Sequence, residues 1–246
     1  MIPAIIIARG ESKRIPRKNL HLFCGLPLIL WTIRAAKASQ NISEVFVSTD
    51  DDEIAGISSF AGAKIIRRKQ PSPDEESGIV PTVNAMQEIH NMTGDTVFIS
   101  CLPTNPVRRP FQIDSMIDLY QTGKYPAVVC GYSPKELVLL ERIDFNGGKP
   151  VIANINHQYW TFMMGDCVVS INYFQQCLQN VQAGLEFEPS SEIIGVIPLE
   201  LWQTHDVDTF EQWEAAEHWF QKKLLSEGED CYERYRKTWK TAQSKD

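Results

Sequence analysis

The stretch MIPAIIIARGESKRIPRKNL, residues 1–20, decides the fold of this chain. Its first part, residues 2–8, is short, almost wholly apolar and rich in isoleucine, which is typical of a strand buried on both faces of a sheet. The loop that follows carries five cations and one acid, a local charge of +4 in a chain whose net charge is −7. A buried strand that ends in a cationic loop indicates a binding site for a polyanion, and phosphate is the first candidate.

Segments of strand and helix character alternate along the chain as far as residue 132. Further strands are predicted over residues 44–49, 63–67, 95–102 and 127–132, and the helices between them over residues 27–39, 50–60, 79–91 and 111–122. Strands and helices that alternate at this spacing form βαβ units, with a parallel sheet and right-handed crossovers. The predicted fold class is therefore α/β.

The pattern changes after residue 133. Residues 137–145 and 150–155 flank Asn146-Gly-Gly148, a turn signal that predicts a hairpin. Strand-like stretches return at residues 167–171 and 193–197. The last clear helix is predicted to begin near Thr209, and one face of it carries Trp213, Ala216, Phe220 and Leu224.

The composition excludes several classes of protein. Hydrophobic residues make up 43% and charged residues 22%, which is ordinary for a globular domain, and the net charge of −7 argues against a nucleic-acid partner. No apolar run approaches the roughly 18 residues of a membrane span, and no signal-peptide pattern is visible, so we expect no membrane partner and a cytoplasmic location. The six cysteines are scattered without a C-x-x-C pair, which favours reduced packing residues over disulfides or a metal cluster.

Open parallel sheets bind ligands at the carboxyl ends of their strands, where this chain places residues 9–19, 49–52 and 103–108. The first segment contains neither G-x-x-x-x-G-K-[ST] nor G-x-G-x-x-G, so the ATPase and dinucleotide interpretations lose their main support. It offers a glycine for close backbone approach, the hydroxyl of Ser12 and several cations. These groups suit a triphosphate, whose negative charge increases as pyrophosphate leaves. The alternative is a solvated basic loop, which the position at a strand end disfavours.

Residues 8–19, ARGESKRIPRKN, resemble the A-R-G-G-S-K-x-[IL]-P-x-K-N signature of the acylneuraminate cytidylyltransferases, the CMP-sialic acid synthetases. Further matches follow in the family's order: VSTD at residues 47–50, Arg67 seven residues before Asp74, PTNPVR at residues 103–108, and Asp206-Val-Asp208. The resemblance covers residues 2–220. It implies a three-layer α/β/α Rossmann-like nucleotidyltransferase domain with a mostly parallel sheet and a small dimerisation excursion.

The resemblance also implies an activity. Members of the family join CMP from CTP to the anomeric oxygen of a nonulosonic acid, a sialic-acid-like 3-deoxy-2-keto sugar acid, and release pyrophosphate with the help of Mg²⁺. We therefore expect a Mg²⁺-dependent nucleotidyltransferase that acts on CTP and a nonulosonic acid as a homodimer. The chain then divides into a nucleotide-binding α/β half, a hairpin and dimerisation excursion, the rest of the α/β domain with the metal motif, and a peripheral tail: residues 1–132, 133–165, 166–225 and 226–246.

The family's motifs assign site residues in this chain by position. The expected nucleotide-binding residues are Arg9, Gly10, Ser12, Lys18, Asn19 and Arg67. The expected substrate-binding residues are Leu102, Thr104 and Arg108, and the expected metal ligands are Asp206 and Asp208. The resemblance implies a catalytic role for Arg9, Lys18 and Asp206. The other cations of the loop, Lys13, Arg14 and Arg17, are interpreted as a surrounding positive field.

The spacing of Asp206 and Asp208 supports the metal pair independently of the resemblance. Two carboxylates at positions i and i+2 of an extended segment point to the same side, so both can reach one Mg²⁺ or its waters. The alternative is that Asp208-x-x-Glu211 forms a capping box for the last helix, but a cap leaves Asp206 unexplained, and we favour the metal. Asp50-x-x-Glu53 is a second candidate capping box, so residues 51–53 are interpreted as structural and Asp50 as a possible site residue. Arg108 binds either a ligand anion or a surface acid.

Two positions depart from the family's pattern. Glu11 replaces a small residue inside the phosphate loop, where it either faces solvent or pairs with Arg14. Leu102 stands where sialate enzymes often carry glutamine, and its side chain cannot make that hydrogen bond. The alternatives are accordingly a related nucleotidyltransferase for another nucleotide or sugar, and a non-catalytic nucleotide- or sugar-binding relative. The form KRIPRKN and the pattern Cys101-x-Pro-Thr104 are closer to the pseudaminic acid branch than to the sialate branch.

Overall fold

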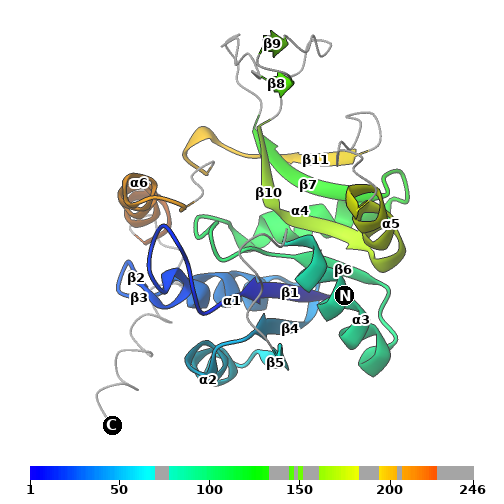
Figure 1. The fold of residues 1–246 in the computed structure, drawn as a ribbon, viewed down its shortest axis with the longest axis horizontal. Coiled ribbons are helices and arrows are strands. Elements are labelled where there is room, and N and C mark those ends of the chain that lie inside the picture. The colour runs from blue at the N-terminus through cyan, green and yellow to red at the C-terminus, as the bar shows by residue number, and fades with distance from the viewer. Residues whose placement is uncertain are drawn as a thin grey trace.

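The computed structural model describes residues 1–69, 78–132, 144–146, 149–151, 161–182, 194–203 and 207–225. Its main element is a seven-stranded sheet in the order β11-β7-β10-β6-β1-β4-β5 (Figure 1). The strands are β1 (Ile2–Ala8), β4 (Ile42–Thr49), β5 (Lys64–Arg67), β6 (Val97–Ser100), β7 (Ala127–Tyr132), β10 (Thr161–Ser170) and β11 (Ile194–Pro198). Neighbouring strands are parallel, except that β10 runs antiparallel to both β6 and β7. The predicted mostly parallel α/β sheet is confirmed.

Strand β1 lies inside the sheet and is buried on both faces. Ala4, Ile6 and Ala8 belong to one hydrophobic cluster, whereas Ile5 belongs to the cluster on the opposite face. Successive side chains of a strand point to opposite faces, so an unbroken apolar run is what a strand with helices on both sides requires. The apolar run of residues 2–8 therefore fits a sheet with a layer of helices on each face.

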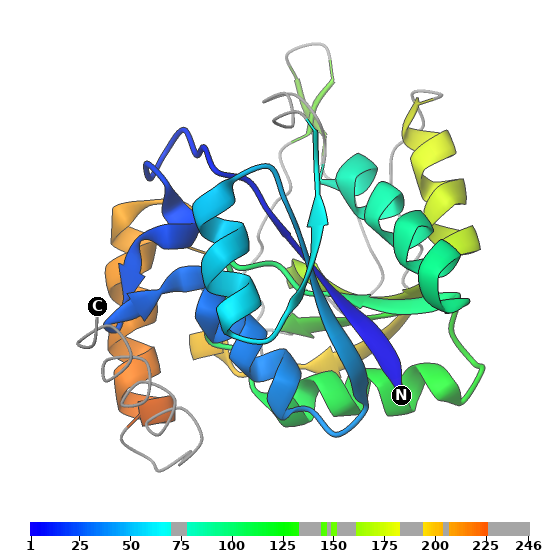
Figure 2. The same cartoon turned by 90° about the horizontal axis from the view of Figure 1, so that it is seen from below.

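Helices cover both faces of the sheet. On one face lie α1 (Leu28–Ala38), α2 (Asp52–Phe60) and α4 (Pro110–Gln121). On the other lie α3 (Ile79–Thr93) and α5 (Ile171–Gln182), which pack side by side (Figure 2). Each of the first four helices was predicted within a few residues of its observed bounds. Together with the sheet they confirm the predicted three-layer α/β/α arrangement.

Helix α5 is absent from the sequence prediction. It begins at Ile171, where the expected strand of residues 167–171 was to end, and β10 instead starts six residues earlier, at Thr161. Six of the twelve residues of INYFQQCLQNVQ are apolar, and four of them, Ile171, Phe174, Leu178 and Val181, recur at the spacing of one helix face. Ile171 and Cys177 are buried, and Gln175 donates to Gln87 of α3 at 3.3 Å. The amphipathic pattern of the segment and its packing against α3 therefore favour the same helix.

A short hairpin before α1 packs against the last predicted helix of the chain. Strands β2 (Leu22–Phe23) and β3 (Leu26–Pro27) are linked by Cys24 and Gly25, whose φ angles of 48° and 85° suit a two-residue turn. Phe23 lies 5.4 Å from Trp213 and 5.3 Å from Phe220, measured between ring centroids. Both aromatic rings belong to α6 (Phe210–Phe220), whose predicted apolar face is buried as expected. The hairpin thus packs α6, from Trp213 to Phe220, against the N-terminal part of the chain.

The shorter elements complete the described structure. They are the 3-10 helices η1 (Lys18–Leu20) and η2 (Leu201–Gln203), the π-helix η3 (Gln221–Leu225) and the strands β8 (Asp144–Asn146) and β9 (Lys149–Val151). Strands β8 and β9 pair antiparallel, which confirms the hairpin predicted from the Asn146-Gly-Gly148 signal. Most of residues 133–165, which were predicted to form a dimerisation excursion, and all of the predicted tail, residues 226–246, lie outside the described residues.

The described residues bear on two expectations from the sequence, the absence of a membrane span and the packing role of the cysteines. None of their helices is long and apolar enough to cross a membrane. The five described cysteines are free thiols, and burial raises the pKa of Cys101 to about 12. A thiol with that pKa stays protonated near neutral pH and is a poor nucleophile, which agrees with a packing role. Cys231 lies outside the described residues.

Candidate active site

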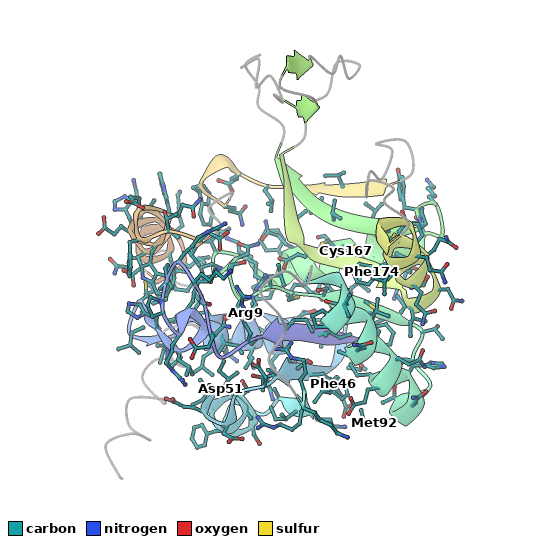
Figure 3. All side chains as sticks on the ribbon, in the orientation of Figure 1. Arg9, Phe46, Asp51, Met92, Cys167 and Phe174 are labelled. Atoms are coloured by element: carbon teal, nitrogen blue, oxygen red, sulfur yellow. The ribbon has the colours of Figure 1, made fainter. Side chains whose placement is uncertain are left out.

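The site lies where three parallel strands end together. Ala8 of β1 pairs with Thr49 of β4, and Thr49 pairs with Arg67 of β5, so the loops after these strands begin at the same level. Figure 3 shows Arg9 and Asp51 on this side of the sheet, whereas Met92 and Phe174 lie on the other. Ligands of open α/β sheets bind at such an edge. The predicted segments of residues 9–19 and 49–52, which follow β1 and β4, are therefore neighbours, and Arg67 at the end of β5 lies beside them.

The basic loop is fixed to the sheet near its start and closed on itself at its end. The Gly10 N–H donates to Asp50 Oδ1 at 2.9 Å, and the buried Asn19 side chain donates to the Arg9 carbonyl at 2.9 Å. Between these points Ile15 is fully buried and anchors the middle of the loop in the core. These contacts fix the backbone of the loop and thereby the positions from which its cationic side chains extend.

Gly10 provides the close backbone approach that its position predicts. A methyl group at Gly10 would lie 2.7 Å from Asp51 Oδ2 and 2.9 Å from Asp51 Cβ. Asp51 has little freedom to move away, because its Oδ1 caps α2 by accepting the Ile54 N–H at 2.9 Å. Only glycine fits between the loop and the first turn of α2.

The Gly10→Ala variant is expected to lose about 1–3 kcal/mol of stability, because overpacking must displace either the loop or the cap. Affinity for CTP should fall with it. Urea denaturation and calorimetry of CTP binding measure the two effects. Gly56→Ala is the matched control, since no atom lies within 4 Å of its new methyl group, and removal of a mid-helix glycine is expected to stabilise α2 slightly. Unchanged stability and CTP affinity in Gly10→Ala would contradict the tight-approach interpretation.

The cap of α2 corrects one sequence interpretation. Asp51 is the N-cap, so the predicted capping box of Asp50 and Glu53 is wrong. Asp50 points instead to the loop, where its carboxylate accepts the Gly10 N–H and lies 3.5 Å from an Arg68 nitrogen. Arg68 also donates to the Ala8 carbonyl at 3.2 Å. This pair was not predicted, and it connects the ends of β1, β4 and β5.

Arg67 of the predicted site and Arg17 of the surrounding positive field contact acids at the start of α2. Arg67 donates to the Asp51 carbonyl at 2.8 Å and forms an ion pair with Asp52. Arg17 bonds Asp51 at 3.1 Å and Glu53 at 2.9 Å. Its φ of 49° is uncommon for a residue other than glycine, and these two ion pairs accompany that conformation. These contacts link the basic loop and the end of β5 to the start of α2, and the nucleotide-binding role expected for Arg67 stays a prediction.

Lys18 and Asp208 meet although 190 residues separate them. Lys18 Nζ donates to Asp208 Oδ1 at 2.7 Å, and Arg14 Nη1 donates to Asp208 Oδ2 at 2.7 Å. Partial burial raises the pKa of Asp208, but the hydrogen bond and charge of Lys18, together with those of Arg14, lower it below its usual value. Asp208 is therefore ionised near neutral pH. The structure brings this predicted metal ligand to the predicted phosphate-binding lysine.

The start of α6 corrects a second capping interpretation. Thr209 is the N-cap: its hydroxyl accepts the Gln212 N–H at 3.3 Å, and the Gln212 side chain accepts the Thr209 N–H at 2.9 Å. The predicted box of Asp208 and Glu211 is therefore wrong. The Asp208 N–H also donates to Gln212, at 2.9 Å, which fixes the backbone while the carboxylate points to Lys18.

The segment of residues 103–108 joins the same site through the backbone. The Val207 N–H donates to the Thr104 carbonyl at 2.9 Å, so the third predicted segment lies beside the one that carries Asp208. Leu102 is half-buried, and its carbonyl accepts a hydrogen bond from Arg108 at 2.7 Å. The substrate-binding roles expected for Leu102 and Thr104 stay predictions.

Arg108 is part of a buried ion pair that was not predicted. It and Asp166 are each 2% exposed, and two guanidinium nitrogens bond the two carboxylate oxygens, with Nε–Oδ2 at 2.7 Å. Arg108 also donates to the hydroxyl of Thr32 at 2.8 Å. These contacts favour an internal role over contact with a ligand or a surface acid. In the sequence, the only feature that marked Asp166 was its position directly before a predicted strand.

Several predicted site residues are placed but do not bond to one another. Ser12 and Glu11 make no hydrogen bond or ion pair with the residues that the structure describes, and Glu11 is exposed. Arg14 pairs with Asp208 rather than with Glu11, so the solvent-facing alternative holds for Glu11. Asp206 lies outside the described residues, and among those described no group of three or more histidine, cysteine or acidic residues could hold a metal ion.

The fold of the chain places it in a structural class. It is similar to CMP:2-keto-3-deoxy-manno-octonic acid synthetase complexed with CTP, with a TM-score of 0.65 and 19% identity over 91% of this chain and 100% of that one. It is also similar to 4-diphosphocytidyl-2C-methyl-D-erythritol synthase from Anaerococcus prevotii, with a TM-score of 0.67 and 15% identity over 89% and 96% of the two chains. The fold is therefore the α/β fold of nucleotidyltransferases.

The family follows from the sequence. A model described as Cytidylyltransferase matches residues 3–136, more than half of the chain, and this chain belongs to that family. It is 35% identical over 127 residues to N-acylneuraminate cytidylyltransferase A of Danio rerio, a match covering 52% of this chain and 29% of that protein. It is 36% identical over 129 residues to CMP-N,N′-diacetyllegionaminic acid synthase of Legionella pneumophila, covering 50% and 55%.

A third relative belongs to the branch that the sequence motifs favour. The chain is 40% identical over 100 residues to pseudaminic acid cytidylyltransferase of Campylobacter jejuni, covering 40% of this chain and 43% of that protein. The predicted resemblance is confirmed. The matched segments span between 29% and 55% of these three relatives' lengths.

Proposed function

We propose that this chain is a Mg²⁺-dependent cytidylyltransferase that joins CMP from CTP to the anomeric oxygen of a nonulosonic acid and releases pyrophosphate. The observation that carries the proposal is the meeting of Lys18 and Asp208, at 2.7 Å, beside a basic loop with the family's signature. Family membership supports the choice of CTP. The names of the relatives, which include sialic, legionaminic and pseudaminic acid enzymes, support a nonulosonic acid.

The residues of the loop would act mainly by electrostatics. In nucleotidyl transfer, negative charge increases on the departing pyrophosphate, and cations placed beforehand around it stabilise the transition state. Lys18, with a side chain only 12% exposed, would supply such a charge from a partly desolvated position. Arg9 and the hydroxyl of Ser12 would add donors from the start of the loop. The sugar hydroxyl would attack from the side of residues 102–108.

The residues present suit Mg²⁺ chemically. Mg²⁺ is commonly bound by one or two carboxylates together with substrate phosphates, and Asp208 is an ionised carboxylate beside the phosphate loop. Asp206 and Asp208 would hold the ion. When bound, Mg²⁺ would neutralise phosphate charge and lower the pKa of the attacking hydroxyl.

Release of pyrophosphate tests the function directly. The protein is incubated with CTP, Mg²⁺ and a panel of nonulosonic acids that includes pseudaminic, legionaminic and N-acetylneuraminic acids. We expect turnover with at least one acid, and the motifs favour pseudaminic acid. Parallel reactions with UTP, GTP and ATP should give none. Turnover with another nucleotide would favour the related nucleotidyltransferase, and folded protein that binds CTP without releasing pyrophosphate would favour a binding protein.

The metal assignment predicts the effect of Asp206→Ala. This variant is expected to lose about 100-fold or more of the pyrophosphate-release rate at low Mg²⁺, because a ligand of the neutralising ion is lost. Part of the loss should recover as Mg²⁺ is raised. The measurement is a Mg²⁺ titration of the rate, with Asp118→Ala, an exposed acid of α4, as control. Wild-type activity at every Mg²⁺ concentration would show that Asp206 is not a ligand.

The proposed assembly is a cytoplasmic homodimer formed through residues 133–165. Its support is the hairpin of β8 and β9, which lies beyond the ends of β7 and β10 in Figure 1. Light scattering at micromolar concentration should give twice the mass of the 28.0 kDa chain. A monomer under these conditions would contradict the proposal.

A further inference from the structure

The carboxylate of Asp208 binds two cations, Arg14 and Lys18, at the edge of the basic loop. The two oxygens of Asp208 accept one hydrogen bond each, from Lys18 and from Arg14, and both donor–acceptor distances are 2.7 Å. Lys18 is nearly buried, whereas the Arg14 side chain is 66% exposed and reaches the carboxylate from the solvent side. We call Arg14, Lys18 and Asp208 the clamp.

We propose that Arg14 is a second phosphate-binding cation of this site, and that Asp208 is the internal counter-ion that holds Arg14 and Lys18 together until a triphosphate replaces it. The proposal rests on the proposed function, because it takes CTP as the source of the triphosphate. It assigns Arg14 a ligand, where the sequence indicated only a surrounding positive field. It also gives Asp208 a role before any metal ion binds.

The chemistry of the clamp favours this exchange. A carboxylate presents two oxygens that share one negative charge, and a phosphate group presents the same type of acceptor with more charge. Two cations held at one acid repel each other once the acid is removed, so the pair needs an anion between them. A triphosphate supplies that anion. Replacement of Asp208 by phosphate oxygens then exchanges one set of charge-assisted hydrogen bonds for another.

The surroundings of Asp208 allow its carboxylate to be released while its backbone stays in place. Its N–H donates to Gln212 of the α6 capping box, and the neighbouring Val207 N–H donates to the Thr104 carbonyl. The Asp208 side chain is 37% exposed, so it can turn into solvent or toward a metal ion without leaving a buried charge. Loss of the two cations would make both carboxylate oxygens available to Mg²⁺ as the triphosphate arrives.

A merely structural role for Asp208 makes the opposite prediction. If the clamp only ties the loop to α6, then removal of the charge of Asp208 loosens the loop and weakens binding of any phosphate ligand. If Asp208 is a counter-ion, its removal frees two cations for the ligand and strengthens binding in the absence of metal. Affinity for a metal-free triphosphate therefore separates the two roles.

The experiment uses inorganic triphosphate as the probe, in EDTA, with calorimetry on the full chain. Asp208→Asn is expected to bind the probe about fivefold tighter than the wild type, because the competing anion is gone. Arg14→Gln is expected to bind it about tenfold weaker, because a charge-assisted bond to phosphate is lost. Glu44→Gln is the matched control, since it also removes an acid ion-paired with a lysine, Lys64, at the far end of β4, and it should bind like the wild type.

Three results would overturn the proposal: folded Asp208→Asn that binds the probe no tighter than the wild type, Arg14→Gln with wild-type affinity, or no binding of the probe by the wild type. Thermal melting verifies folding, and Arg14→Gln gives an independent answer should Asp208→Asn not fold. The probe contains neither nucleoside nor sugar, so this test does not depend on turnover. Absence of pyrophosphate release with every acid would refute the proposed function and leave the clamp result standing.

Discussion

Replacement of Lys18 by alanine is expected to lower the rate of pyrophosphate release from CTP by about 100- to 1,000-fold. Lys18 supplies a positive charge from a nearly buried position, where the low local dielectric strengthens its attraction for phosphate. The interaction grows as charge develops on the departing pyrophosphate, so the loss should affect kcat as well as KM. Steady-state kinetics with CTP and the acid that supports turnover measure both constants.

The fold should survive this change. The contact of Lys18 with Asp208 involves a partly exposed acid, and pairs of this kind contribute about 1 kcal/mol or less to stability. Lys64→Ala is the matched control, because it also removes a lysine that is ion-paired with an acid, at the opposite end of the sheet. It should keep wild-type rates. Lys18→Ala with wild-type kcat and KM would exclude Lys18 from the phosphate site.

The Asp166→Ala variant is expected to lose about 3–5 kcal/mol of unfolding free energy. Asp166 and Arg108 are each 2% exposed, so removal of the acid leaves a guanidinium charge buried without its carboxylate. Contact with the Thr32 hydroxyl and the Leu102 carbonyl cannot replace that charge. Urea denaturation measures the loss as a lower midpoint.

A surface pair of the same chemistry provides the control. Asp52 is ion-paired with Arg67, but its side chain is 97% exposed, so Asp52→Ala should cost about 1 kcal/mol or less. A double variant, Arg108→Met with Asp166→Leu, removes both charges and should recover much of the stability lost in Asp166→Ala. Equal losses in Asp166→Ala and Asp52→Ala would show that burial of the Arg108 pair does not determine its contribution.

Much of the fold could be predicted because it follows from local patterns. The apolar run of β1 needs helices on both faces wherever it is placed, and the alternation that follows fixes parallel neighbours. Helix α5 was missed because half of its residues are polar, although its apolar residues recur at helical spacing and pack against α3. The two capping boxes show that the residue at which a helix begins is harder to predict than the helix itself. At both helices the cap is one residue later than predicted, at Asp51 and Thr209, because adjacent residues offer equivalent side chains and only the backbone geometry chooses between them.

The sequence by itself determined the N-terminal strand, the basic loop at its end and the family, because these depend on residues next to one another in the chain. Only the tertiary structure decided which acid each cation meets. Asp208 joins Lys18 across 190 residues, and Asp166 joins Arg108 across 58. Opposite charges attract at any sequence separation, so a list of acids and bases leaves many pairings open. The packed sheet and the position of α6 bring particular acids and bases together, and that arrangement sets whether a charge is buried or available to a ligand.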